Sequence, residues 1–389
     1  TTQTVFERAA NAFEFIVRNG DEADTQRGFH RTLSAAAYHL AGYSAIAFSL
    51  FGEDQRSFNE APAEIALAKL ILRDLSGLRA YVRDWLTNDN VDDEGLRFAL
   101  DQDHVDAEEA IGSILNISVC RALAFYDFAL QTGEHLLVET ARTLLETAQS
   151  LAANAAVVPL WWIIRICRNV IDDLWGSSLH VTLPQAPPAG GEEKYSELRQ
   201  LFIATLYRRK LAEVELWPSQ REAAERSTDL TDDLVVALPT SAGKTRVAEI
   251  AALMTLSTGR RVLIVTPLRA LSAQTERSFR KTFAPLGFTV SSLYGAAGVS
   301  ATDEDALRSR DIIIATPEKL DFALRNDPSL IDDVGLIVLD EGHLIGPSER
   351  EIRYEILVQR LLRRPDNAGR RIVCLSAILP GGEQLDDLT

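Results

Sequence analysis

Two short segments of the chain combine residue types that can hold a triphosphate and activate water. The first runs from Pro239 to Thr245 and contains small residues, a glycine and a lysine. In a loop between a strand and a helix, backbone N–H groups surround phosphate oxygens, a lysine reaches the outer phosphates and a threonine hydroxyl can ligate magnesium. The residues expected to contact the nucleotide in this loop are Thr240, Ser241, Ala242, Gly243, Lys244 and Thr245.

The second segment is an acidic pair, Asp340 and Glu341, which follows an apolar stretch and lies 96 residues after Lys244. At the carboxyl end of a parallel strand, such a pair points into the crevice where ligands bind. Asp340 can then hold Mg²⁺, commonly through water, while Glu341 orients and deprotonates the attacking water. Leu238 stands where phosphate loops usually begin with glycine, so it is the combination of both segments that predicts an ATP site with Mg²⁺ as cofactor. The predicted catalytic residues are Lys244, Asp340 and Glu341.

Strands must position these residues, and short apolar stretches in the back half predict where they run. Helical periods separate the stretches, and strands that alternate with helices form a parallel sheet covered on both faces. The predicted strands are 233–238, 261–265, 290–293, 312–315, 335–339 and 371–375.

The front of the chain has a different pattern. Apolar residues recur there at steps of three and four, as in Leu67, Ile71, Leu75 and Leu78, which is typical of packed helices. Prolines and glycines concentrate in residues 183–193 (LPQAPPAGGEE), where the pattern changes. We therefore predict an all-α domain over 1–182, a linker over 183–196 and an α/β domain over 197–389.

The composition is that of a soluble globular protein, with 46% hydrophobic and 25% charged residues among 389. Residues 33–51 and 151–164 are apolar, but the first is rich in small residues and the second contains proline, so neither predicts a membrane span. Three distant cysteines and an acidic start without a signal peptide favour a reduced, cytoplasmic protein. The chain begins without Met, which suggests a piece of a longer protein.

The net charge of −16 is concentrated at the front. Residues 1–190 carry 26 acidic against 14 basic side chains, and residues 191–389 carry 30 against 26. A field of this sign repels phosphates, so any nucleic-acid contact is expected in a local groove of the back half. The helical front is instead expected to dock a protein partner.

Four further motifs accompany the two phosphate segments in a fixed order: residues 216–220 (LWPSQ), 266–271 (TPLRAL), 316–321 (TPEKLD) and 376–378 (SAI). Together the six motifs resemble the first RecA-like domain of a superfamily 2 helicase, in the Ski-like DExH branch, over roughly residues 214–389. Within that branch they are similar to DNA-repair helicases, including the polymerase-theta helicase domain. Residues 350–364 (REIRYEILVQRLLRR) also resemble the helix after the acidic box in those enzymes.

This resemblance implies a P-loop RecA-like fold and roles for the additional motifs. The Gln220 amide would pair with the adenine edge, and Trp217 would either cover the base or be an ordinary core residue. His343 and Ser376 would couple the nucleotide state to the strand-binding face, although Ile378 stands where threonine is usual. The residues implied to grip a single strand are Thr266, Pro267, Arg269, Thr316 and Pro317.

The resemblance thus implies an ATP-dependent helicase or translocase that moves 3′ to 5′, with single-stranded DNA favoured over RNA and no membrane partner. The large helical front suggests prokaryotic antiviral defence, beside DNA repair. An exosome-type RNA helicase and a nucleotide-switched scaffold that moves no strand are the alternatives. Because no second RecA-like domain occurs within the 389 residues, its arginine fingers are missing, and these residues alone are expected to hydrolyse ATP poorly.

Overall fold

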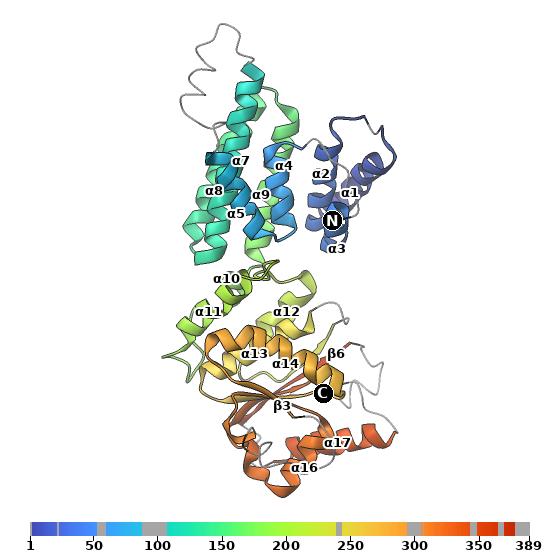
Figure 1. Ribbon diagram of the computed structural model, residues 1–389, viewed down its shortest axis with the longest axis vertical. Helices are drawn as coiled ribbons and strands as arrows, with labels where there is room; N and C mark the ends of the chain where they lie inside the picture. The colour runs from blue at the N-terminus through green and yellow to red at the C-terminus, as the bar shows by residue number, and fades with distance from the viewer. Residues whose placement is uncertain are drawn as a thin grey trace. The chain divides into compact units, whose positions relative to one another are not determined.

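The computed structural model describes residues 2–21, 23–52, 60–87, 107–238, 243–293, 305, 307–342, 348–364 and 369–377 (Figure 1). The chain divides into two compact units. The first consists of Thr1–Val181 and Tyr207–Glu215, and the second of Thr182–Leu206 and Leu216–Thr389. Residues 207–215 therefore belong to the helical unit although they lie between two segments of the other, which the sequence pattern did not predict.

The regular elements described in the first unit are helices, and its segment 208–215 is irregular apart from an isolated antiparallel bridge between Ser178 and Glu215. Its elements are α1 (Thr2–Asn19), α2 (Arg27–Leu40), α3 (Ser44–Gly52), α4 (Pro62–Ile71), α5 (Leu75–Thr87), α7 (Ala107–Thr132), α8 (His135–Asn154) and α9 (Val158–Gly176), and α10 (Leu179–Thr182) follows at the boundary. Helix α1 packs on α2, and α7, α8 and α9 pack in succession. Gly133, at a φ of 82°, makes the tight turn between α7 and α8, and a Cβ there would lie 2.7 Å from His180 Nδ1. Small and aliphatic side chains fill the core between these helices.

The apolar segment 33–51 is divided between α2 and α3. Among the described residues, one helical segment, Ala110–Thr132 within α7, is long and apolar enough to cross a membrane by length and composition alone. The most apolar part of this segment is 56% buried inside the protein. A buried core helix has the same properties, and the sequence reasoning had overlooked this segment.

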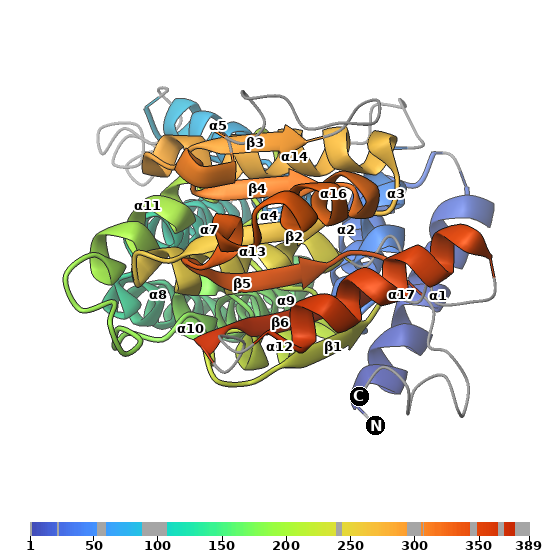
Figure 2. The ribbon, with the colours of Figure 1, turned by 90° about the horizontal axis from the view of Figure 1, so that it is seen from below.

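The second unit is built on a six-stranded sheet in the order β1-β6-β5-β2-β4-β3, with every neighbouring pair parallel. Figure 2 shows the strands side by side. Their bounds are β1 (Leu234–Ala237), β2 (Arg261–Val265), β3 (Val290–Leu293), β4 (Ile312–Ala315), β5 (Val334–Leu339) and β6 (Arg371–Ser376). The predicted parallel sheet is confirmed, and the predicted strands coincide with the observed ones to within one residue.

Helices cover both faces of this sheet, as expected for parallel strands that are buried on both sides. Helices α13 (Lys244–Ser257) and α14 (Arg269–Phe283) lie on one face (Figure 1). Helices α16 (Pro317–Asn326) and α17 (Glu349–Leu362) lie on the other, where the aliphatic residues of β2, β4 and β5 form a buried cluster with them (Figure 2). The predicted RecA-like α/β architecture with a helical region before it is therefore confirmed.

The remaining described elements of the second unit lie at its start and between the strands. They are α11 (Tyr195–Tyr207), α12 (Pro218–Arg226) and the 3₁₀ turns η2 (Ala284–Leu286) and η3 (Pro328–Ile331). The buried Arg371 guanidinium at the start of β6 ties α12 to the sheet, since it donates to the carbonyls of Arg226, Ser227 and Asp232. Arg371 thus holds the C-terminal end of α12 on the sheet. The LWPSQ motif lies at the N-terminal end of the same helix.

Candidate nucleotide site

Residues just after β1 and β5 donate backbone hydrogen bonds to neighbouring strands. These bonds fix the two segments that the sequence predicts to bind the nucleotide. The Leu238 N–H donates to the Ser376 carbonyl at 3.0 Å, and the Asp340 N–H donates to the Val265 carbonyl at 2.9 Å. The Gly342 N–H donates to the carbonyl of Leu375, also at 2.9 Å. The parallel topology therefore brings the motifs to one edge of the sheet, where ligands bind in such folds.

The phosphate loop leads from β1 into α13. Gly243 is the residue before this helix and has a left-handed φ of 78°, which glycine adopts without strain. Lys244 is buried at 7% exposure, whereas Thr245 is exposed. Thr240, Ser241 and Ala242 lie outside the described residues, so their predicted contacts with phosphate remain predictions.

Gln220 lies against this loop and uses both ends of its amide. Its Oε1 accepts from the Trp217 N–H at 2.9 Å, and its Nε2 donates to the Gly243 carbonyl at 3.1 Å. Pro218 occupies the first helical position of α12 and Gln220 the third, so the WPSQ spelling is also a helix-start signal. A primary amide has two donor hydrogens and two acceptor lone pairs, so one of each remains for a base edge. Trp217 is half exposed, which disagrees with the alternative of a core tryptophan.

The acidic pair forms a tight turn after β5. Asp340 Oδ1 accepts from the Glu341 N–H at 3.1 Å, and Glu341 has a positive φ of 52°, unusual for a residue with a side chain. Gly342 passes so close to β6 that a Cβ on it would lie 2.1 Å from Cys374 Sγ. The turn therefore has a defined shape set by its two neighbouring strands.

The two segments meet in an ion pair. Lys244 Nζ lies 3.1 Å from Glu341 Oε1, with the two side chains 8% and 17% exposed. The lysine from the phosphate loop and the glutamate from the acidic turn are thus in direct contact, although 97 residues separate them. This contact is the predicted convergence of the two motifs.

The residues present suit magnesium bound together with a nucleotide. Mg²⁺ prefers hard oxygen donors and usually takes only one or two protein ligands beside phosphates and water. Thr245 supplies an exposed hydroxyl and Asp340 a partly exposed carboxylate. In the described part of the chain, no group of three or more His, Cys, Asp or Glu residues could hold a metal on its own.

The predicted strand-binding residues differ in how accessible they are. Thr266 is fully buried, its hydroxyl bonded to Ser272 and its N–H to the Ala315 carbonyl. Thr316 is 7% exposed and its N–H donates to the Leu293 carbonyl. Both prolines, Pro267 and Pro317, are buried as well. Of this set only Arg269, at the start of α14, has an exposed side chain.

The structure describes one of the two residues predicted to couple the nucleotide state to the strand-binding face. Ser376 ends β6, is 1% exposed, and accepts the Leu238 N–H that precedes the phosphate loop. His343 lies outside the described residues. Ser376 thus has a direct backbone link toward the nucleotide loop.

Sequence reasoning missed a pair of residues beneath the acidic turn. Tyr354 of α17 and Cys374 of β6 are buried in the same apolar cluster as Leu339. Burial raises the pKa of Cys374 to about 11, with the Asp340 charge a smaller cause. The pKa of Tyr354 is raised for the same two reasons and by Cys374. Tyr354 lies in the segment 350–364 that resembles the helix after the acidic box, but no role was predicted for either residue, and only apolar neighbours in the sequence signalled their burial.

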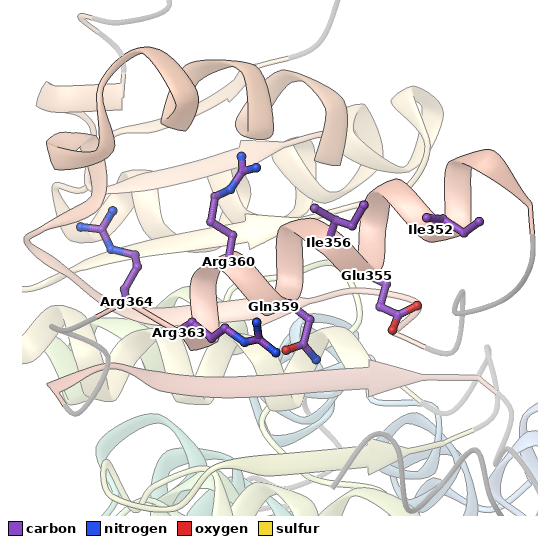
Figure 3. A pocket seen from close by; sticks show the side chains of 7 residues that line it. All are labelled: Ile352, Glu355, Ile356, Gln359, Arg360, Arg363 and Arg364. Carbon is purple, nitrogen blue, oxygen red and sulfur yellow. The ribbon is translucent and has the colours of Figure 1, made fainter.

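A surface hollow lies on the outer side of α17 and just beyond it (Figure 3). Its lining residues are Ile352, Glu355, Ile356, Gln359, Arg360, Arg363 and Arg364. Arg360 also pairs with Asp321, and Arg364 with Asp332. None of the predicted site residues lines this hollow, so it is separate from the nucleotide site.

Comparison with known proteins agrees with this geometry. A DEAD/DEAH box helicase family model matches residues 217–388. Residues 217–388 belong to the superfamily 2 helicases. The helicase domain therefore occupies the second unit, from the LWPSQ motif through β6.

Two relatives differ in how much of the chain they match. Hachiman protein HamB of Bacillus cereus is 28% identical over 377 residues, which are 96% of this chain and 32% of HamB. ATP-dependent DNA helicase Hel308 of Pyrococcus abyssi is 38% identical over 172 residues, which are 44% of this chain and 23% of Hel308. The chain thus spans about a third of one relative and about a quarter of the other. Of these two alignments, the one with HamB is long enough to include the helical unit with the helicase domain.

Among solved structures, the crystal structure of DUF1998 helicase MrfA is similar at 20% identity and a TM-score of 0.42. The alignment covers 53% of this chain and 32% of that one.

Proposed function

We propose that this chain is part of an ATP-dependent DNA helicase or translocase that moves 3′ to 5′ on a single strand. The observation that carries the proposal is the contact between Lys244 and Glu341 at the carboxyl edge of the sheet. The Hel308 relatives, which are named ATP-dependent DNA helicases, support DNA as the strand.

In the proposed reaction, the Lys244–Glu341 pair opens when a triphosphate enters. The ammonium of Lys244 then faces the outer phosphates, and the freed Glu341 carboxylate orients the attacking water and accepts its proton. Asp340 and Thr245 would hold Mg²⁺, which neutralises charge on the phosphate oxygens when bound. The exposed Trp217 and the remaining donor and acceptor of Gln220 would recognise the adenine base.

The strand would pass along the starts of α14 and α16. Because the N–H groups and hydroxyls of Thr266 and Thr316 are buried, they would shape this surface, and Arg269 would contact phosphates directly. Contacts with the sugar-phosphate backbone position a strand and carry no base sequence. We therefore expect binding that depends on salt and little on sequence.

The alignment with HamB supports a role of the whole protein in prokaryotic antiviral defence. The three free cysteines are the reason to propose a cytoplasmic location. In this proposal the helical unit docks a protein partner rather than the strand, in keeping with the acidic excess of residues 1–190. A role in DNA repair is the alternative that the Hel308 relatives favour.

Strand-dependent ATP hydrolysis by the full-length protein tests the proposal. Single-stranded DNA should stimulate turnover more than RNA of the same sequence. Glu341→Gln should retain ATP and lose turnover by about 10³-fold, whereas Lys244→Ala should lose ATP binding. Turnover of Glu341→Gln near the wild-type rate would contradict the assignment.

The same assay separates the rival functions. Stronger stimulation by RNA would identify an RNA helicase of the exosome type. ATP-dependent partner binding without stimulation by either strand would identify a nucleotide-switched scaffold. Unwinding of duplexes with a 3′ or a 5′ single-stranded tail gives the polarity.

A further inference from the structure

The segment Tyr207–Glu215 belongs to the helical unit, and the chain enters the second unit at Leu216. Trp217 follows at once, and its N–H donates to Gln220, whose Nε2 donates to the Gly243 carbonyl of the phosphate loop. Only Leu216 separates Glu215 from Trp217. The last anchored residue of one unit is therefore next to the first functional motif of the other.

Glu215 is held by Arg73, which follows α4. Arg73 Nε donates to Glu215 Oε2, and the two side chains are 12% and 7% exposed. The same arginine donates through one terminal nitrogen to the Ile71 carbonyl at 2.6 Å, and its own carbonyl accepts from the Ala212 N–H at 3.0 Å. The carbonyl of Val214 accepts from the Leu179 N–H at 2.7 Å. Side-chain and backbone bonds thus fix the end of this segment.

Arg73 also has a backbone conformation that side chains disfavour, with a φ of 60°. A left-handed residue other than glycine costs about 1–2 kcal/mol and persists only where its surroundings hold it. Here the strained position brings the guanidinium to Glu215 and the carbonyl to Ala212. Such an outlier is a reason to look for a role beyond packing.

From Glu215 a continuous path leads to the nucleotide site. The Trp217 N–H donates to Gln220 Oε1, and Gln220 Nε2 donates to the Gly243 carbonyl. Gly243 precedes Lys244, which pairs with Glu341. Along the chain, the Arg73–Glu215 pair thus lies two residues before the Trp217 N–H that fixes the Gln220 amide.

We propose that Arg73 and Glu215 are positioning residues for nucleotide recognition. By fixing the point at which the chain enters α12, they keep the Gln220 amide against the phosphate loop, so that ATP affinity and the preference for ATP over GTP depend on an ion pair of the helical unit. This proposal rests on the proposed role of Gln220 in base recognition. By linkage, a partner that alters the Arg73–Glu215 pair changes nucleotide affinity, and nucleotide changes partner affinity by the same factor.

The test replaces both partners at once, because removing one would leave a buried charge without compensation. The variant Arg73→Met/Glu215→Met keeps side-chain volume and removes the pair. The matched control is Arg31→Met/Glu60→Met, a pair of the same unit with a contact of 2.6 Å and side chains 9% and 15% exposed. Dissociation constants of fluorescent ATP and GTP analogues are measured on the full-length proteins, with thermal unfolding as the check of folding. In the Arg73→Met/Glu215→Met variant, called the anchor variant, the ratio of GTP to ATP dissociation constants should fall at least about fivefold. The control variant should keep the wild-type ratio.

Gln220→Ala, alone and combined with the anchor variant, separates the two levels of the proposal. If Gln220→Ala alone leaves the ATP preference unchanged, base recognition by Gln220 is wrong. If Gln220→Ala lowers the preference but the anchor variant resembles the wild type, the positioning role is overturned. In the expected result the two changes are not additive, because both act through the same amide. If Arg73→Met/Glu215→Met fails to fold, Glu215→Gln provides the same comparison. An unchanged preference for ATP over GTP in Glu215→Gln also overturns the positioning role of the pair.

Discussion

The two units hold their important residues in place by different means. In the helicase domain, backbone bonds across strand ends fix the positions of Asp340, Gly342 and Thr266. In the helical unit, side chains from distant parts of the chain do this work: the buried Asp127 carboxylate accepts from Tyr207 Oη at 2.7 Å and from Arg79 Nε at 3.0 Å. Where backbone hydrogen bonds position a site, only the few motif residues that do the chemistry need a particular side chain. Where side chains hold one another in place, each of them is required.

Among the variants that test this comparison between the units, the largest effect is expected where backbone geometry and a motif coincide. Gly243→Ala would place a Cβ 1.9 Å from Gln220 Nε2 at a left-handed φ, so the loop or the glutamine must shift. Misplacement of about 1 Å in a catalytic group can cost roughly a hundredfold in rate, and we expect a loss of that size in strand-stimulated ATP turnover.

Gly259→Ala is the matched control for this substitution. Gly259 lies just beyond α13 with a φ of 76°, but a Cβ there meets no atom within 4 Å. It should therefore lower stability by about 1 kcal/mol and leave turnover unchanged. Equal losses of turnover in both variants would mean that the effect comes from backbone strain rather than from the contact with Gln220.

A smaller effect is expected at the acidic turn. Gly342→Ala would bring a Cβ to 2.1 Å from Cys374 Sγ, and overpacking of this kind costs roughly 1–3 kcal/mol. If the turn carries that strain, turnover should fall about tenfold. Cys374→Ala removes the sulfur and should restore turnover when combined with Gly342→Ala. Failure of the double variant to recover would show that contact with Cys374 does not set the shape of the turn.

The same contrast explains what could be predicted from sequence. Strand 261–265 was recognisable because a continuous apolar run between helical periods is typical of a strand buried on both faces. The convergence of Lys244 and Glu341 followed from topology, since residues after parallel strands share one edge. Strand ends and edge chemistry are local properties, and a single sequence contains them.

Other features depend on packing between distant residues and could not be predicted. Nothing in the composition of Tyr207–Glu215 indicates that it belongs to the helical unit, because its partners, Arg73 and Asp127, lie about 80 residues or more upstream. The burial of the Thr266 hydroxyl against Ser272 likewise depends on how α14 meets the sheet. In both cases the deciding contact is between side chains whose spacing follows no regular period.

The two units can be compared through a glutamate at the same position of a helix. Glu64 at the third position of α4 accepts from the Ala61 N–H at 3.2 Å, and Glu351 at the third position of α17 accepts from the Ser348 N–H at 3.0 Å. Burial raises the pKa of Glu64 from 4.5 to about 7, whereas hydrogen bonds from Ser348 lower the pKa of Glu351. The capping hydrogen bond lowers the pKa of both glutamates, but at Glu64 burial outweighs it and makes the net shift opposite.

For Glu64 the folded state binds more protons than the unfolded chain between pH 4.5 and 7, so its contribution to stability falls as pH rises through that range. Glu64→Gln should therefore stabilise the protein at pH 8 by about 2 kcal/mol and change little at pH 4.5. Glu351→Gln should instead slightly destabilise it at pH 8, because a lowered pKa stabilises the folded state above the unfolded value. Chemical unfolding at pH 4.5 and pH 8 measures the free energy of unfolding of each variant. Stabilisation by both variants at pH 8 would contradict the opposite pKa shifts of the two glutamates.

The smallest effect concerns strand binding. Each arginine that neutralises one phosphate adds about 0.7 to the slope of log affinity against log salt for a single strand. Arg269→Gln in the helicase domain should weaken single-stranded DNA binding a few-fold and lower that slope by about this amount. Arg121→Gln changes an equally exposed arginine on α7 of the helical unit and should alter neither quantity. Fluorescence anisotropy titrations of the full-length proteins at several salt concentrations give both values. A reduced slope for Arg121→Gln would place phosphate contacts on the acidic helical unit, and would mean that local arginines there overcome the repulsion expected from its net charge.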